Sequence, residues 1–246
     1  MLKLICGLIR QSGGEILFNG EKINPASGNY LSKIGYMPQK LGFLNDYKVF
    51  DFLIYIASLK GFYGNEAKKE AKRLIRLLDL TEEQNKPMKA LSGGNAQRVG
   101  IAQAMFGEPE ILILDEPTVG LDPKERIKIR NIISSYSSFH TVILSTHIVS
   151  DISDIAGEII IMDHGNIIAH GSERQLADGF DGSVWTLSAD REQAEEICGR
   201  YCISNTFVSE TSIELRIVSK EKPHPDARPA EPTLEDLYLF YCGEDI

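Results

Sequence analysis

The run Ile111-Leu112-Ile113-Leu114 constrains the fold more than any other segment of the sequence. Its four apolar residues do not alternate with polar ones, a pattern typical of a strand that is covered on both faces. Such strands occur in parallel sheets that lie between layers of helices. A second strand of this kind is expected at 141–145, and helical patterns at 92–106 and 123–138 flank the two strands. The sequence up to about residue 157 therefore predicts an α/β fold.

Other segments place hairpins and helices around this sheet. Asn19-Gly20 predicts a turn inside a hairpin at 14–23, because both residues of such a turn must take positive φ. A second hairpin is expected at 158–169, and a short strand at 34–39. Apolar residues at helical spacing predict helix over 49–80, and the apolar start of the chain, 1–9, is interpreted as a core helix rather than a signal peptide.

The pattern changes after Gly179, and we expect a domain boundary there. Residues 1–180 would form the main α/β domain, with a helical subdomain at about 45–107. Residues 181–246 would form a small α+β domain. Its expected elements are strands at 184–188, 203–208 and 212–218, helices at 190–201 and 233–241, and a loop at 220–232 rich in proline and charge.

Composition excludes some classes of protein. Lys and Arg total 26 against 35 Asp and Glu, for a net charge of −9, which argues against nucleic-acid binding through a broad basic face. A nucleotide site is compatible with this charge, since a phosphate needs only a few local donors. No stretch reaches the roughly 18 apolar residues of a membrane span. The four cysteines, Cys6, Cys198, Cys202 and Cys242, form no C-x-x-C pair and indicate reduced thiols of a cytosolic protein, with a zinc site as the alternative.

Two adjacent carboxylates, Asp115 and Glu116, follow the central strand. Ligands of open α/β sheets bind beyond the carboxyl ends of the strands, and two neighbouring anions are costly to bury without a cation. A nucleotide-bound Mg²⁺ would meet that need. Asp115 would hold the ion through water, and Glu116 would orient and deprotonate a water that attacks the γ-phosphate. The alternative is a solvated Asp-Glu turn.

The segment Leu91-Ser92-Gly93-Gly94-Asn95-Ala96-Gln97-Arg98 opens a predicted helix. Ser92 is a favourable N-cap residue, and the two glycines allow a phosphate to approach the first amide groups of the helix. Taken alone, this pattern is equally that of a plain cap and turn. Its position before a helix and an apolar strand ending in Asp-Glu-Pro favours a phosphate site.

Five motifs in this order resemble those of ATP-binding-cassette (ABC) nucleotide-binding domains, over residues 1 to about 175. Leu91–Arg98 is similar to the signature motif, although the family usually has Gln where Asn95 stands, and 111–117 is similar to the Walker B strand. Gly120–Pro123 resembles the D-loop, Ser145–His147 the switch-histidine segment and Tyr36–Gln39 the Q-loop. The resemblance implies a P-loop NTPase-like ABC ATPase core with a helical subdomain.

The resemblance also implies the roles of individual residues, with ATP and Mg²⁺ as cofactors. Glu116 would be catalytic, assisted by His147, which as a neutral ring would donate a hydrogen bond to the γ-phosphate. Asp115 would bind the metal, and Gln39 would contact the metal or the attacking water. Ser92, Gly93 and Gly94 would contact a nucleotide held by the opposite protomer, and Asp122 would cross the dimer interface. The remaining histidines are expected to be structural or solvated: His140, His164, His170 and His224.

The phosphate-cradling pattern G-x-x-x-x-G-K-[ST] does not occur, since the sequence has no Gly-Lys dipeptide. Met1–Leu8 resembles the helix that follows this Walker A loop, so we expect the chain to be a truncated form that begins just after the loop. A true variant that has lost the loop but lends Ser92–Gly94 to a partner's nucleotide is the alternative. On either interpretation we expect the 246-residue chain alone to bind ATP weakly or not at all and, with an interior strand missing, to be poorly soluble.

The sequence is thus identified as an ATPase subunit of an ABC transporter. It would work with a separate transmembrane permease subunit and a second cassette, identical or paralogous, on the inner face of the cell membrane. Glu231–Tyr238 resembles the tail of ABC-2 exporter subunits and favours export, although it also fits a capped amphipathic helix. The alternatives are a non-catalytic regulatory cassette and a soluble ABC ATPase outside transport. No nucleic-acid partner is expected.

Overall fold

The computed structural model describes residues 1–246 except 25–26, 154, 181, 210–211 and 244–246. It forms two compact units, Met1–His147 and Ile148–Ile246, which are described separately. This division differs from the predicted boundary at 180/181. The reason is that the hairpin at 159–171 shares its buried core with Leu176, Leu234 and Leu237, which lie later in the chain. The hairpin therefore belongs to the second unit.

The first unit contains the predicted parallel sheet. Its strands β3 (Ile34–Met37), β4 (Ile111–Asp115) and β5 (Thr141–Ser145) are hydrogen-bonded in the order β3-β4-β5. β4 lies in the middle, and all four of its apolar side chains are buried. Ile111 and Ile113 pack with Cys6 and Tyr30, while the alternate residues of the strand point to the other face. The sequence prediction of a strand covered on both faces is confirmed.

Helices α5 (Gly93–Met105) and α6 (Pro123–Ser137) pack against the sheet, α5 on β3 and β4 and α6 on β5. β5 pairs only with β4 among the described residues, and its apolar side chains are half-buried. The edge strand thus has an apolar centre, Val142–Leu144, like that of an interior strand, and an edge position leaves backbone hydrogen-bonding groups unpaired along one side of a strand.

Short elements precede β3. They are α1 (Leu2–Ile5), the hairpin β1 (Leu17–Phe18) with β2 (Glu21–Lys22), and α2 (Gly28–Leu31). The Asn19-Gly20 turn has positive φ at both residues, 52° and 80°, as predicted. The prediction of a helix over 1–9 is wrong in length, because Gly7 takes a φ of 68° and the helix ends before it.

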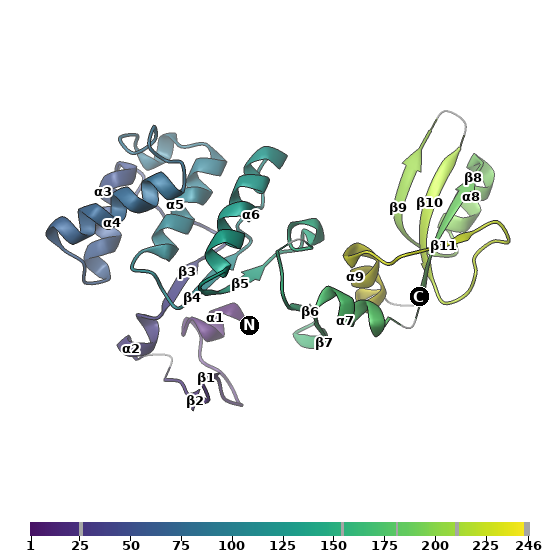
Figure 1. Cartoon of the computed structure of the whole chain (residues 1–246), viewed down its shortest axis with the longest axis horizontal. Coiled ribbons are helices and arrows are strands. Elements are labelled where there is room, and N and C mark those ends of the chain that lie inside the picture. The colour runs from purple at the N-terminus through teal and green to yellow at the C-terminus, as the bar shows by residue number, and fades with distance from the viewer. Residues whose placement is uncertain (25–26, 154, 181, 210–211, 244–246) are drawn as a thin grey trace. The chain divides into compact units, whose positions relative to one another are not determined.

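The helical part of the first unit consists of α3 (Val49–Leu59), α4 (Gly64–Leu77), the short 3₁₀ helix η1 (Met88–Ala90) and α5. Figure 1 shows α3, α4 and α5 gathered at one end of this unit. The helical pattern predicted over 49–80 is split into two helices, because Gly61 and Gly64 adopt φ of 84° and 59°. Leu53, Ala57 and Leu74 are fully buried between these helices.

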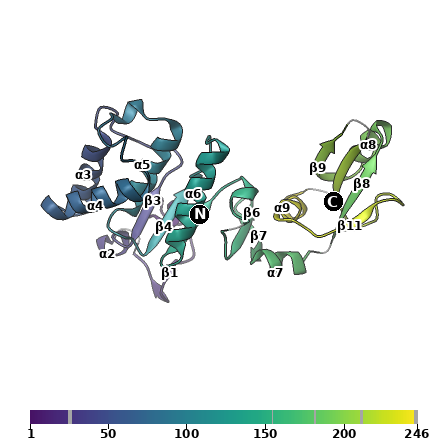
Figure 2. The same ribbon diagram turned by 45° about the horizontal axis from the view of Figure 1, so that its top comes forward.

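The second unit has two parts. The first comprises η2 (Val149–Asp151), the hairpin β6 (Ile159–Asp163) with β7 (Asn166–Gly171), and α7 (Glu173–Asp178). The second is an antiparallel sheet in the order β11-β8-β10-β9, with β8 (Ser183–Ala189), β9 (Cys202–Val208), β10 (Ile213–Ser219) and β11 (Arg228–Ala230). α8 (Arg191–Cys198) covers one face of this sheet through Ala194 and Ile197, and Figure 2 shows it beside β8.

Helix α9 (Leu234–Cys242) links these two parts. Its Leu234 and Leu237 enter the core of the hairpin, while Asp236 accepts hydrogen bonds from Arg216 of β10. The predicted strands and helices of this region are confirmed, and the structure shows a capping box at the start of α8 and of α9. The loop predicted at 220–232 is wrong in one place, since β11 lies within it. Pro229 is accommodated there because β11 is an edge strand.

Candidate functional site

The carboxyl ends of β4 and β5 bring Asp115 and Ser145 together. The two residues are paired in the sheet register, and Ser145 Oγ donates a hydrogen bond of 2.6 Å to Asp115 Oδ1. The hydroxyl of Tyr36, from the adjacent strand β3, lies 3.5 Å from the other carboxylate oxygen. Residues from all three parallel strands therefore hold one carboxylate at the edge where ligands of such sheets bind.

Glu116 occupies a constrained position next to Asp115. Its backbone has a φ of 54°, in the left-handed region, and its amide donates to Ser145 O at 3.0 Å. Non-glycine residues in this region cost about 1–3 kcal/mol and persist where the surroundings fix them, which is common at functional sites. Its Oε1 lies 2.8 Å from His147 Nδ1, whereas its Oε2 is buried and has no hydrogen-bond partner. Glu116 thus has one oxygen in contact with His147 and one buried oxygen without a hydrogen-bond partner.

Two of the side chains near Asp115, those of Cys6 and Tyr36, are uncharged. Burial raises the pKa of the Cys6 thiol to about 11, and the nearby Asp115 carboxylate adds to the rise. Burial also raises the pKa of the Tyr36 hydroxyl, again with a contribution from Asp115. Cys6 and Tyr36 therefore stay protonated at neutral pH. Asp115 and Glu116 are the anionic groups of this cluster.

The Ser92-Gly93-Gly94 turn forms the start of α5. Ser92 is the N-cap residue, and its Oγ accepts a hydrogen bond from the amide of Asn95 at 3.3 Å, as predicted. A Cβ added to Gly93 would meet nothing within 4 Å, whereas a Cβ on Gly94 would lie 3.0 Å from the carboxylate of Glu125. Gly93 therefore borders open space at a helix N-terminus, where an anion is favoured, and Gly94 permits the close approach of α6.

Arg98 and Glu125 join the signature-like helix to the next one, and the sequence reasoning missed both residues. Arg98 is buried, its Nη2 donates to Asn95 Oδ1 at 2.7 Å, and the same atom lies 3.0 Å from Glu125 Oε2. The amide of Glu125 is in turn capped by Asp122 Oδ1 at 3.0 Å. The i,i+3 spacing of Asn95 and Arg98 on a helix was a signal for the first contact, but nothing in the sequence pairs Arg98 with Glu125.

The predicted site residues form two groups within the first unit. One group is Asp115, Glu116 and His147 at the strand ends, with Gln39 exposed two residues beyond β3. The other is Ser92, Gly93, Gly94 and Asp122 at the N-termini of α5 and α6, connected through Glu125. Among the described residues, no hydrogen bond joins the Ser92 turn to Asp115 or Glu116.

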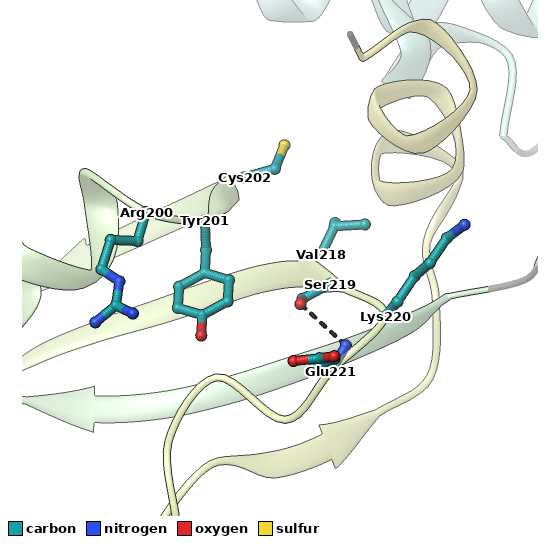
Figure 3. A pocket seen from close by; sticks show the side chains of 7 residues that line it. All are labelled: Arg200, Tyr201, Cys202, Val218, Ser219, Lys220 and Glu221. Atoms are coloured by element: carbon teal, nitrogen blue, oxygen red, sulfur yellow. Dashed lines mark hydrogen bonds between the residues drawn. The ribbon is translucent and has the colours of Figure 1, made fainter. Parts of the chain in front are cut away.

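The second unit carries two hollows that contain none of these residues. One has a volume of about 300 Å³ (Figure 3) and is lined by Arg200, Tyr201, Cys202, Val218, Ser219, Lys220 and Glu221. There the Ser219 hydroxyl accepts a hydrogen bond from the Glu221 amide, and Arg200 pairs with Glu196. The other, of about 490 Å³, lies over the sheet beside Arg216 and Phe207. Neither hollow was anticipated from the sequence.

The expectations for the cysteines and for membrane-spanning segments can be examined in the described part of the chain. There, all four cysteines are free thiols, and no three His, Cys, Asp or Glu side chains gather as a metal site. None of the helices in that part is long and apolar enough to cross a membrane.

Comparison with known proteins agrees with the motifs. The family model for ABC transporters matches residues 1–119. The ABC transporter ATP-binding protein sll0415 of Synechocystis is 32% identical, over 99% of this chain and 71% of the relative. YhaQ of Bacillus subtilis, also named as an ABC transporter ATP-binding protein, is 31% identical over 76% of this chain and 62% of the relative.

A further relative is the linearmycin resistance ATP-binding protein LnrL of Bacillus subtilis, which is 30% identical over 74% of this chain and 59% of its own length. The chain thus spans less than two thirds of YhaQ and LnrL and somewhat more of sll0415. Together with the parallel sheet and the motifs at its strand ends, these similarities establish that the chain belongs to the family of ABC transporter ATP-binding proteins.

Proposed function

We propose that the chain is an ATP-hydrolysing subunit of an ABC exporter and that Asp115, Glu116 and His147 form its catalytic group. The observation that carries this proposal is the pair of carboxylates at the strand ends. Asp115 is held by Ser145 and Tyr36, and Glu116 is held by His147 with one buried oxygen unpartnered. Buried polar atoms are nearly always hydrogen-bonded, so Glu116 Oε2 indicates a ligand at this position.

The residues present fit a magnesium ion. Mg²⁺ prefers carboxylate oxygens and water, and it is usually held by one or two carboxylates together with substrate phosphates. Asp115 would hold the ion, with Gln39 as a further oxygen donor from the same edge of the sheet. When bound, the ion would neutralise charge that develops on the phosphates of ATP.

Glu116 and His147 would act on the attacking water. A carboxylate only accepts hydrogen bonds, so in the 2.8 Å contact His147 Nδ1 donates a hydrogen bond to Glu116 Oε1. This fixes the orientation of the carboxylate and leaves Oε2 to accept a proton from water. A neutral His147 with its proton on Nδ1 has an acceptor at Nε2, so a hydrogen bond from Nε2 to phosphate requires the protonated ring.

The second group of residues would act across a dimer of cassettes. Ser92, Gly93 and Gly94 lie apart from the carboxylate pair, which supports a role toward a nucleotide held by the opposite cassette, with Asp122 at the interface. A membrane-spanning permease would be the partner through which the cassettes act, at the cytoplasmic face of the membrane. Export is supported by the resistance function in the name of LnrL and by the Thr233-capped tail helix.

A second candidate function is that of a non-catalytic cassette. The absence of a Gly-Lys dipeptide from the sequence favours it, because the lysine and backbone amides of such a loop hold the β- and γ-phosphates. Such a cassette would lend the Ser92 turn to the partner's ATP and would not use Glu116. The two candidates therefore differ in which variants impair hydrolysis.

The test is phosphate release from Mg-ATP by the membrane complex isolated through a tag on this chain. The catalytic proposal predicts that Glu116→Gln and Ser92→Ala each lower the rate by about a hundredfold or more, the size of effect typical of general-base residues. The non-catalytic alternative predicts that only Ser92→Ala lowers it. Unchanged rates in both variants would contradict both candidates.

Two control variants match the chemistry of the substitutions. Glu158→Gln alters another carboxylate beside a histidine, since Glu158 Oε2 lies 3.3 Å from His170 Nε2 in the second unit. Ser172→Ala removes another serine N-cap, that of α7. Both controls are expected to retain the wild-type rate.

A further inference from the structure

Helix α4 concentrates positive charge in a chain whose net charge is −9. Four of its cations, Lys68, Lys69, Lys72 and Arg76, are solvent-exposed. Within the described residues none of the four takes part in an ion pair, whereas Arg73 of the same helix pairs with Glu70 at 2.7 Å. These four side chains are therefore available to an anionic partner.

The four cations lie on one side of the helix. Successive residues of an α-helix are rotated by about 100°, so positions 68, 69, 72 and 76 form a stripe roughly 12 Å long. The buried residues Ala67, Ala71, Leu74 and Ile75 form a separate face, which borders the stripe at Lys68 and packs against α3 and α5. The stripe thus points away from the core.

The acidic residues of α4 do not interrupt this stripe. Glu66 and Glu70 share the flank of Arg73 by the same helical geometry, and Glu70 is neutralised by Arg73 through two hydrogen bonds. The net negative charge of the whole chain has little effect at this distance, because charges more than about 8 Å apart are largely screened at physiological ionic strength. The local potential over the stripe is therefore positive.

Exposed apolar groups lie at the end where α4 begins. Tyr63, the N-cap residue of α4, is 69% exposed, and Leu59, the last residue of α3, is 66% exposed. Tyrosine is favoured where one end of a side chain meets lipid and the other meets water. Figures 1 and 2 both place α3 and α4 at the end of the first unit away from β5, so this surface is separate from the strand-end site.

We propose that α4 binds the anionic headgroups of a phospholipid bilayer through Lys68, Lys69, Lys72 and Arg76, with Leu59 and Tyr63 at the apolar boundary. A lipid surface fits better than nucleic acid, because Leu59 and Tyr63 together give the stripe apolar neighbours that suit an interface, and Tyr63 is the one aromatic side chain among the described residues of this surface. The surface would orient the chain on the membrane independently of nucleotide and of any permease.

The experiment is flotation of the purified chain with vesicles through a density gradient, in the absence of nucleotide, because flotation separates vesicle-bound chain from any aggregate. Vesicles of phosphatidylcholine alone are compared with vesicles containing one third phosphatidylglycerol, at low and physiological salt. We expect binding to the anionic vesicles that weakens with salt. Each cation near such a surface contributes about fivefold to affinity, so replacing all four by glutamine should reduce binding by more than about a hundredfold.

A matched variant controls for net charge. Lys3, Arg10, Lys40 and Lys124 are also exposed, and their replacement by glutamine changes the net charge equally but should leave vesicle binding near the wild-type level. A second variant replaces the same four residues by glutamate. Because all four side chains lie on the surface, the same loss of vesicle binding is expected. Circular dichroism melting checks that each variant is folded.

Three results would overturn the proposal. These are equal binding to neutral and anionic vesicles, equal loss in the stripe and control variants, and tight stripe-dependent binding of a labelled RNA without vesicle binding. The outcome is distinguishable from that of the proposed ATPase function, since phosphate release by the complex can be normal when the chain fails to bind vesicles.

Discussion

Asp236 of α9 provides the sharpest test of how the second unit is held together. Its side chain is fully buried and accepts hydrogen bonds from Arg216 Nε at 3.1 and 3.0 Å and from Arg216 Nη2 at 2.7 Å. It also accepts from the Thr233 amide at 2.7 Å and from the Thr233 hydroxyl at 2.8 Å. The substitution Asp236→Ala removes all of these acceptors at once.

The expected cost follows from the burial of the pair. Removing one partner of a buried ion pair costs about 3–5 kcal/mol, and loss of a helix cap costs about 1 kcal/mol. The Arg216 side chain is 22% exposed and also donates to the carbonyl of Glu231, so part of its charge stays solvated. We therefore expect a loss of about 3 kcal/mol in the free energy of unfolding.

Tryptophan fluorescence measures this loss in the right part of the chain. Trp185 is the one tryptophan of the sequence, and it lies on β8 beside the core of the second unit. With a urea m-value of about 2 kcal/mol/M, the fluorescence midpoint should fall by about 1.5 M. The control Asp226→Ala, at an exposed carboxylate of the same unit, should change stability by less than about 0.5 kcal/mol.

The effect should also depend on pH. Burial alone would raise the pKa of Asp236, but hydrogen bonds from Arg216, Ser204 and Thr233 outweigh it and hold that pKa below its ordinary value. A carboxyl with a lowered pKa in the folded state stabilises the protein above its unfolded pKa of about 4 and loses that contribution as pH falls further. Wild type and Asp236→Asn should therefore converge below about pH 4. A fall of less than about 0.3 M in the urea midpoint of Asp236→Ala at neutral pH would contradict the expected cost. A difference in stability between wild type and Asp236→Asn that persists well below pH 4 would contradict the lowered pKa of Asp236.

Two further predictions concern the first unit. Gly35→Ala should lower the free energy of unfolding by about 3 kcal/mol or more, because the added Cβ would lie 2.1 Å from the backbone oxygen of Ala104. The control Gly13→Ala should be neutral, since nothing lies within 4 Å of its added Cβ. Thermal melting followed by circular dichroism compares the two variants. Cys6 should react with a thiol reagent at pH 8 far more slowly than the exposed Cys198, because burial raises the pKa of Cys6 to about 11. Mass spectrometry measures the two rates of modification. Equal rates would contradict the packing around Cys6.

Much of the fold was predictable because local patterns determined it. The unalternated Ile111–Leu114 run specified a buried parallel strand, and the capping residue Ser92 marked a helix start that the structure confirms. Each of these signals depends on neighbours within a few residues. The division at 147/148 was not predictable, because it arises from packing between the hairpin and α9, which are far apart in sequence.

For the candidate site, the sequence indicated where the proposed residues lie on the fold but not the contacts that they make. Asp115, Glu116 and His147 follow strands that the patterns identified, and the parallel sheet places their ends together. The roles of Ser145 and Tyr36 in holding Asp115 needed the strand order and register, and the pairing of Arg98 with Glu125 needed the packing of two helices. No local pattern of the sequence encodes such contacts.

The nucleotide retained by a Glu116→Gln complex distinguishes a residue that acts on the attacking water from one that holds ATP. The isolated complex with Glu116→Gln is incubated with radiolabelled Mg-ATP, and the nucleotide that it retains is identified. We expect the variant to retain ATP at the wild-type stoichiometry and to release almost no phosphate. Retention of ADP with normal phosphate release, or loss of nucleotide binding altogether, would contradict the role assigned to Glu116.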